Sequence, residues 1–278
     1  MNLKTKIMKK TWLLLLFITP FFFACNSGEE SDEQGQTDTV IVEEETQMVL
    51  STIKVPSPVE LYMFMYNAGL KYDKKFLNPA DRNSKYVTNY KKSLNFGIYA
   101  SDLAYCTVFK QNKETFTFFS ATKKMAEELG LTDGFDEAIV KRIDANISNS
   151  DSLYQITNDS YATATSFIEQ QGNGALLPLM LTGAWIESVH IAAKSIKKFS
   201  AEDEIVLLIA DQQFLLESLL EMFEAIPEED NHPELIEKLK DIQESFDKMY
   251  DNVDERITEK QYEEIVTKIK VLRAEIVG

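Results

Sequence analysis

The sequence has few of the residues that build covalent or metal-held sites. Only two cysteines and two histidines occur among its 278 residues. Cys106 lies in the apolar stretch DLAYCTVF, where a free cysteine behaves as a small core residue, and Cys25 borders an N-terminal apolar run. We therefore expect no intramolecular disulfide. Such a sparse set of histidines and cysteines also provides no zinc site, so we expect no metal and no cofactor.

Motifs for nucleophilic catalysis and phosphate binding are absent as well. The sequence contains no G-x-S-x-G and no G-x-x-x-x-G-K-[ST]. Glu187 and His190 have the Glu-x-x-His spacing of ferritin-like di-iron sites, which need two such pairs and two further glutamates. The second pair, Glu229 and His232, lies in PEEDNHP, which we predict to be a loop. We therefore predict that the protein is not an enzyme.

Positive charge is also scarce. The chain has 29 Lys and Arg against 45 Asp and Glu, which gives a formal net charge of −16. A protein this acidic repels phosphate backbones, so we expect no nucleic-acid partner. No lysine-rich face suggests direct docking on anionic lipid.

The N-terminus carries a basic segment followed by a short apolar run. Four lysines lie between residues 4 and 10, and the run extends from Trp12 to Phe23 with Pro20 inside it. A transmembrane helix needs about 20 apolar residues, so this run is too short for a lasting anchor. Residues 1–24 are predicted to be a secretory signal peptide.

Cys25 follows this run directly. The stretch Phe22-Phe23-Ala24-Cys25 resembles a bacterial lipobox, with phenylalanine where leucine is usual. The resemblance implies that Cys25 becomes the lipidated N-terminus of a lipoprotein, which several acyl chains would hold firmly at the membrane. The alternative is a plain secreted protein in which Cys25 is incidental.

Residues 25–55 are polar and acidic, and we predict a disordered tether. The cluster Glu29, Glu30, Asp32 and Glu33 looks like the acidic export tag of surface lipoproteins in the Bacteroidota. An ordinary solvated linker is the alternative, so an outer-membrane lipoprotein could be surface-exposed or periplasm-facing. Removal of residues 1–24 deletes four lysines and no acidic residue, which changes the net charge from −16 to −20.

Residues 56–278 are predicted to form one all-α domain. No strand-like alternation recurs, and apolar residues repeat at helical spacing. Ser57-Pro58 begins the first helix, and the last two helices, with their narrow apolar stripes, are predicted to form an antiparallel hairpin. About nine helices are expected, near residues 58–68, 84–110, 114–129, 135–147, 151–170, 175–198, 202–226, 233–252 and 258–277.

Two of these helices are apolar nearly all round and are therefore expected at the centre. They read LNFGIYASDLAYCTVF and LTGAWIESVHIAAKSI, and aligning Gly97 with Gly183 places Tyr99 on Trp185. Glycine inside a helix costs about 1 kcal/mol relative to alanine, so both glycines predict a close helix crossing. The alignment favours two related helical halves, although two apolar helices can also be similar by chance.

The segments LNFGIYASDLAY and TGAWIESVHIA resemble those of uncharacterised all-helical lipoproteins of the Bacteroidota. The resemblance covers roughly residues 85–200. It implies an all-helical envelope protein, and it implies no particular activity.

A polar cluster is predicted where the two central helices cross. Asp102 lies among apolar residues, and a buried carboxylate needs a partner. Glu187 and His190 lie one turn apart on the other helix. Together they form a candidate site for a polar ligand or a cation, with an aromatic wall of Tyr99, Tyr105 and Trp185. In the structural alternative Asp102 bonds a neighbouring hydroxyl or amide, while Glu187 and His190 form a surface pair with Lys194.

These observations favour a lipid-anchored, non-catalytic interaction or scaffold protein acting through its helical surface. The alternative is a small-ligand-binding module with an inter-helical pocket near Asp102, Trp185 and Glu187. A pocket of several hundred Å³ beside Asp102 and Trp185 would favour the ligand-binding module, and a large exposed apolar patch would favour the scaffold. The expected partners are the membrane, through Cys25, and an envelope protein or small ligand.

Overall fold

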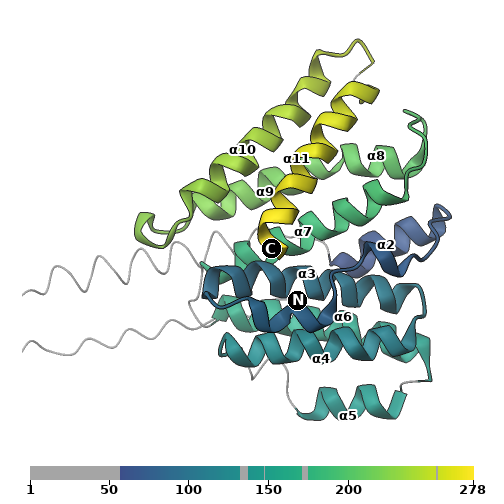
Figure 1. Cartoon of the computed structure of the whole chain (residues 1–278), viewed down its shortest axis with the longest axis vertical. Coiled ribbons are helices and arrows are strands. Elements are labelled where there is room, and N and C mark those ends of the chain that lie inside the picture. Colours follow the sequence, from purple (N-terminus) through teal and green to yellow (C-terminus); the bar gives the residue numbers. More distant parts are fainter. Residues whose placement is uncertain (1–56, 132–136, 147, 171–174, 255) are drawn as a thin grey trace, which may run out of the picture.

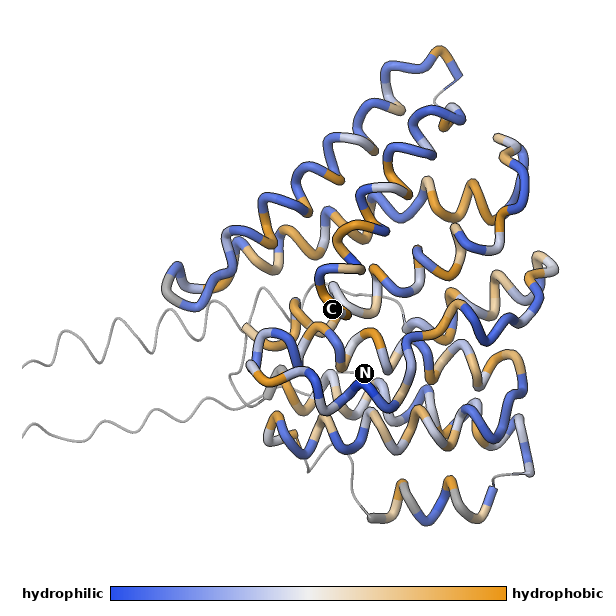
Figure 2. The backbone as a smooth tube through the Cα atoms, viewed as in Figure 1, coloured by the Kyte–Doolittle hydropathy of each residue, from blue (hydrophilic) through white to orange (hydrophobic). Residues whose placement is uncertain are grey.

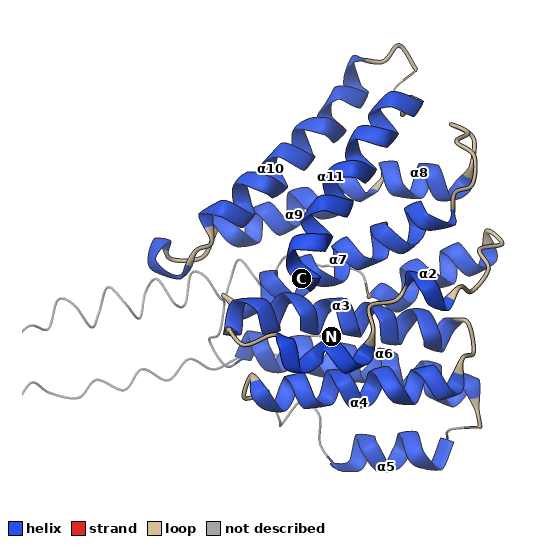
Figure 3. Cartoon of the chain, viewed as in Figure 1, coloured by secondary structure: helices blue, strands red, loops and turns tan. Residues whose placement is uncertain are grey.

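The computed structural model describes residues 57–131, 137–146, 148–170, 175–254 and 256–278. These residues form ten α-helices and no strand (Figure 3), so the prediction of an all-α fold is confirmed. The helices are α2 (Pro58–Asn67), α3 (Asn89–Val108), α4 (Asn112–Glu128), α5 (Glu137–Asn146), α6 (Ser150–Gln170), α7 (Leu176–Ser195), α8 (Glu204–Ala210), α9 (Gln212–Glu224), α10 (Pro233–Asp247) and α11 (Glu259–Val277). The predicted signal peptide, Cys25 and the tether lie outside the described residues.

The start and end of α2 follow the predicted signals. Ser57 is the N-cap, and its hydroxyl accepts a hydrogen bond from the Val59 amide, with Pro58 at the first helical position. Gly69 ends the segment with φ = +90°, a conformation that glycine adopts without steric cost. The following loop contains two 3₁₀ turns, Lys74–Phe76 and Ala80–Lys85.

One predicted helix proves to be two, which raises the number from nine to ten. The segment 202–226 breaks at Asp211, which ends α8 and caps the start of α9. Both pieces pack on α7. The prediction was wrong because the apolar pattern continues across Asp211, so periodicity alone gives no sign of the break between α8 and α9.

Helices α3 and α7 form the centre of the fold and cross in backbone contact (Figure 1). A Cβ atom added at Gly97 would lie 1.9 Å from the Met180 carbonyl oxygen. A Cβ atom at Gly183 would lie 1.9 Å from the Leu94 carbonyl oxygen. The predicted close crossing at the two glycines is therefore confirmed, whereas the common origin of two helical halves stays a prediction.

The other helices are arranged around this crossing. Helices α2, α4 and α6 pack on α3, and α5 packs on α6 at the edge of the domain. Helices α8, α9 and α11 pack on α7. In Figure 2 orange hydrophobic stretches alternate with blue hydrophilic ones along the helices. Of the described helices only α7 is long and apolar enough to cross a membrane, and 89% of its apolar window is buried inside the domain. Its composition is thus that of a core helix.

Helices α10 and α11 form the predicted antiparallel hairpin, which projects from the domain (Figure 1). Lys248 pairs with Glu264 near the turn, and Lys238 pairs with Glu275 at the far end. The predicted eighth helix ends earlier than expected, at Asp247, and a 3₁₀ turn follows. Val253 lies beyond that turn and is fully exposed.

Candidate functional site

The crossing brings Asp102 and Glu187 together in the core. Asp102 comes from α3 and Glu187 from α7, and neither side chain is exposed to solvent. The Asn78 amide donates a hydrogen bond to Asp102 Oδ2 at 3.1 Å. That contact with a neighbouring amide is the one that the structural alternative describes.

Arg273 of α11 supplies the positive charge beside these two carboxyl groups. It was not among the predicted site residues. Its Nε donates to Glu187 Oε2 at 2.5 Å and its Nη2 donates to Glu187 Oε1 at 2.7 Å. Such a two-pronged arginine–carboxylate contact is strong and directional. Glu187 therefore pairs with Arg273 in the core and not with Lys194 at the surface, which corrects the structural alternative on this point.

Burial raises the pKa of both carboxyl groups, but the two differ in their neighbours. The nearby negative charge of Glu187 raises the pKa of Asp102 further, whereas Arg273 opposes the rise at Glu187. Asp102 Oδ1 accepts no hydrogen bond from any residue that the structure describes. The arrangement fits a neutral Asp102, protonated on Oδ1, beside an ionised Glu187 paired with Arg273.

A chain of hydroxyl groups lies beside the carboxyl pair. Ser188 Oγ donates its proton to the Ala184 carbonyl oxygen. It must therefore accept in its second hydrogen bond, with Ser101 Oγ at 2.9 Å. Ser101 Oγ in turn accepts from the Tyr62 hydroxyl at 2.8 Å. Burial raises the pKa of the Tyr62 hydroxyl, and the negative charge of Glu187 adds to this rise. The core at the crossing is thus hydrogen-bonded and uncharged apart from one ion pair.

The Asp102→Asn variant should be at least as stable as the wild type at pH 7. A carboxyl group with a raised pKa in the folded state contributes its full stability below its unfolded-state pKa, near 3.9, and loses it as the pH rises toward the folded-state pKa. An asparagine side chain keeps an oxygen that accepts from the Asn78 backbone amide, and it places an NH₂ donor where the protonated Oδ1 lies. Its amide group does not ionise between pH 4 and pH 7. Urea unfolding should therefore show a variant advantage that grows from pH 4 to pH 7.

The Asp102→Leu variant provides the control, because it leaves the Asn78 amide buried without a partner and should lose about 1–3 kcal/mol. A loss for Asp102→Asn that is greater at pH 7 than at pH 4 would contradict the assignment of a neutral Asp102.

The tyrosines of the predicted site form no hydrogen bond with Asp102 or Glu187; their hydroxyl groups bond to other described residues. The Tyr99 hydroxyl donates to the Pro79 carbonyl oxygen at 2.9 Å, and the Tyr105 hydroxyl accepts from the Asp73 amide at 2.9 Å, so both tyrosines hold the loop after α2. Trp185 lies two residues before Glu187, and residues two apart on a helix face different sides. Trp185 is therefore not part of an aromatic wall beside the carboxyl pair. Tyr99 and Tyr105 lie three residues on either side of Asp102, on the same face of α3, as predicted.

His190 lies beside the ion pair but does not bind its carboxylate. Burial lowers the pKa of His190 to about 3, and the positive charges of Arg273, Lys194 and Lys270 add to this effect. The imidazole is therefore neutral at physiological pH. In the described ranges no group of three His, Cys, Asp or Glu side chains could hold a metal ion.

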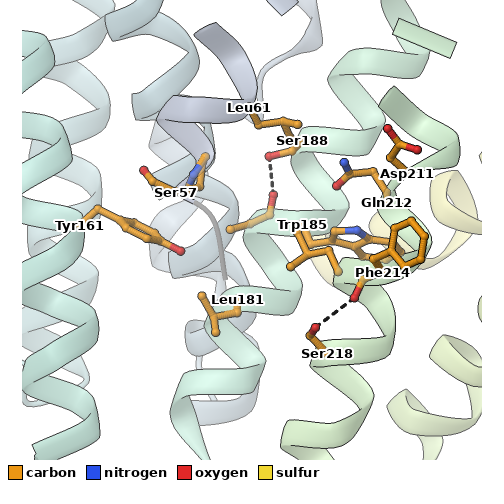
Figure 4. Close-up of a pocket in the computed structure, with 13 residues that line it drawn as sticks. Ser57, Leu61, Tyr161, Leu181, Trp185, Ser188, Asp211, Gln212, Phe214 and Ser218 are labelled. Atoms are coloured by element: carbon orange, nitrogen blue, oxygen red, sulfur yellow. Dashed lines mark hydrogen bonds between the residues drawn. The ribbon is translucent and has the colours of Figure 1, made fainter. Parts of the chain in front are cut away.

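Trp185 lines a pocket on the opposite side of α7 (Figure 4). The α7 wall consists of residues spaced i, i+3, i+4 and i+7, which share one helix face. The start of α2, Tyr161 of α6 and the beginning of α9 complete the pocket, whose volume is about 290 Å³. Its lining residues are Ser57, Pro58, Leu61, Tyr161, Leu181, Ala184, Trp185, Ser188, Asp211, Gln212, Phe214, Leu215 and Ser218.

Three buried polar atoms of the pocket residues have no hydrogen-bond partner among the described residues. They are Trp185 Nε1, Gln212 Oε1 and the Tyr161 hydroxyl. The Tyr161 hydroxyl points from α6 toward α7, and Trp185 and Gln212 lie on the opposite side (Figure 4). Each such atom costs about 1–3 kcal/mol when it stays unpaired, so a bound molecule that pairs with them would gain affinity.

Comparisons with known proteins identify no relative of this chain. Comparison of the chain with protein-family models, with curated proteins and with solved structures finds no match. Function must therefore be argued from the site alone.

The pocket was only partly foreseeable. Trp185 was predicted as a ligand-contacting residue, but Tyr161, Gln212 and Asp211 were missed. They come from separate segments, and the break at Asp211 that positions two of them leaves no trace in the apolar pattern. Ser188 is shared between the pocket lining and the hydroxyl chain, so the pocket and the carboxyl pair are neighbours across α7.

Proposed function

We propose that this protein is a lipid-anchored lipoprotein of the cell envelope that binds a small molecule in the Trp185 pocket. The observation that carries the binding function is the set of unpaired polar atoms around a cavity of about 290 Å³. Ligand pockets typically have about 300–1,000 Å³ and place a few polar groups within an apolar lining. The Trp185 pocket has this composition, and its volume lies just below that range.

The carboxyl pair at the crossing has a structural role in this proposal. Asp102 and Glu187 are closed off from solvent, and Arg273 already occupies the carboxylate of Glu187. A ligand would have to displace that ion pair to bind there, at the cost of a buried unpaired charge. The Trp185 pocket requires no such displacement.

Filling the pocket should abolish ligand binding. In Ser218→Trp the new indole would occupy the cavity, whereas Glu217→Trp places the same side chain on the exposed side of α9. Native mass spectrometry of the full chain, purified gently from its own cells, should show a bound small molecule in the wild type and in Glu217→Trp. The bound mass should be missing from Ser218→Trp. Equal ligand content in both variants would contradict the assignment of the pocket.

The Cys25→Ala variant tests the proposed anchor. Without the thiol no lipid can be attached, so the protein should leave the membrane fraction or accumulate with residues 1–24 uncleaved. Metabolic labelling with a clickable fatty acid should mark the wild type alone. Equal labelling of Cys25→Ala would rule out lipidation at this residue, and it would leave the pocket proposal intact.

A scaffold acting through its surface is the second candidate. It is favoured by the end of the α10–α11 hairpin, where Tyr250 and Val253 are 58% and 107% exposed. Large exposed apolar patches mark contact sites, and Tyr250 and Val253 contribute exposed apolar surface at the end of this projecting element. Crosslinking in intact cells with and without Tyr250→Ala separates this role from ligand binding, since Tyr250 does not line the Trp185 pocket.

A further inference from the structure

The charges around the Trp185 pocket are of one sign. Among the described lining residues Asp211 is the only ionisable acid or base apart from the Tyr161 phenol, and none of them is Lys, Arg or His. The Asp211 carboxylate makes no hydrogen bond or ion pair with another described residue, and partial burial raises the pKa of this carboxyl group. An anionic ligand would find no counter-charge there, whereas a cationic ligand would find one.

The walls of the pocket are aromatic. Trp185, Phe214 and Tyr161 line it from three helices, and Phe214 is 57% exposed. Figure 4 shows Trp185 and Phe214 on one side and Tyr161 on the other. The faces of aromatic rings attract organic cations, and tryptophan does so most strongly.

The unpaired polar atoms of the pocket indicate that the ligand carries an oxygen atom. Trp185 Nε1 can only donate, so its partner must be an acceptor. Gln212 Oε1 can only accept, and the Tyr161 hydroxyl can do either. A hydroxyl group meets both needs, since it accepts from the indole and donates to the amide oxygen.

We propose that the Trp185 pocket binds a small organic ammonium ion that carries a hydroxyl group. Asp211 and the aromatic rings hold the cation, and Trp185 Nε1 with Gln212 Oε1 holds the oxygen. The net charge of −16 attracts cations to the protein. A bare divalent metal ion fits poorly, because one carboxylate does not provide the six or more oxygen ligands of such an ion. This assignment rests on the proposed function and specifies its ligand class.

Calorimetric titration of the full chain with choline tests the assignment. The matched neutral probe is 3,3-dimethyl-1-butanol, in which carbon replaces the ammonium nitrogen at the same shape and with the same hydroxyl group. The protein is kept in a non-ionic detergent, because zwitterionic headgroups carry an ammonium group themselves. We expect choline to bind at least about tenfold more tightly than the neutral alcohol.

Variants assign the binding to the pocket. Asp211→Asn and Phe214→Leu should each weaken choline binding by about tenfold. Glu217→Gln removes the same charge from α9 outside the pocket and should leave the affinity unchanged. Circular dichroism and urea unfolding confirm that each variant is folded.

The outcomes separate this inference from the general proposal. The ammonium assignment would be overturned if choline and the neutral alcohol bound with equal affinity. It would also be overturned if Asp211→Asn and Glu217→Gln weakened choline binding equally. Failure of both probes to bind would also overturn it. The pocket itself is judged independently, by whether a mass of any chemical class is bound to the wild type and missing from Ser218→Trp.

Discussion

Replacing Gly97 by alanine should lower the free energy of unfolding by about 3 kcal/mol, the upper end of ordinary overpacking. The new methyl group would lie 1.9 Å from the Met180 carbonyl oxygen. A backbone atom cannot rotate away as a side chain can, so α3 and α7 must separate. The loss should occur although alanine is the better helix former by about 1 kcal/mol.

Gly183→Ala should behave in the same way, because its methyl group would meet the Leu94 carbonyl oxygen. One separation of the two helices relieves both contacts, so the double variant should lose less than the sum of the single losses. Ser120→Ala, on the exposed face of α4, introduces the same residue without a contact and should stabilise slightly. Urea unfolding of the wild type and the four variants gives the comparison, and an unchanged midpoint for Gly97→Ala would refute the close crossing.

Arg273→Met should cost about 3–5 kcal/mol, because it leaves the Glu187 carboxylate buried without its counter-charge. Glu187 is fully buried and receives two hydrogen bonds from Arg273. The double variant Glu187→Gln/Arg273→Met removes the charge as well and should recover a large part of this loss.

Lys268 supplies the matched control. It lies on α11, as Arg273 does, but it forms an ion pair with Asp241 of α10 near the surface. Exposed pairs contribute about 0–1 kcal/mol, so Lys268→Met should have a small effect. If Arg273→Met is no more destabilising than Lys268→Met, the buried ion pair does not hold α11 against α7.

Local patterns predicted the helices, and one local pattern predicted a long-range contact. Glycine is unfavourable inside a helix unless something needs the space, so Gly97 and Gly183 indicated where α3 and α7 meet. The break at Asp211 was not predictable in this way, because both sides of it continue the same apolar spacing. Ser57 and Gly69 marked the ends of α2 through capping and positive φ, which are properties of single residues.

The site was predicted less completely than the fold, for physical reasons. Asp102 and Glu187 could be paired because each is a carboxylate on an apolar helix that must be central. Arg273 left a signal that was overlooked: it follows Ile269 by four residues and precedes Ile276 by three, so it lies on the buried face of α11. The Trp185 pocket depends on how four separate segments converge, and no spacing within one segment encodes that.

The emission of Trp185 tests the central claim, that the pocket beside α7 is a binding site. The chain has two tryptophans, Trp12 and Trp185, so Trp12→Phe leaves a single reporter inside the pocket. We predict that the small-molecule fraction of the source cells shifts or quenches this emission in the full chain carrying Trp12→Phe, in a saturable manner. Unchanged emission at every concentration, from a protein shown to be folded by circular dichroism, would contradict the account.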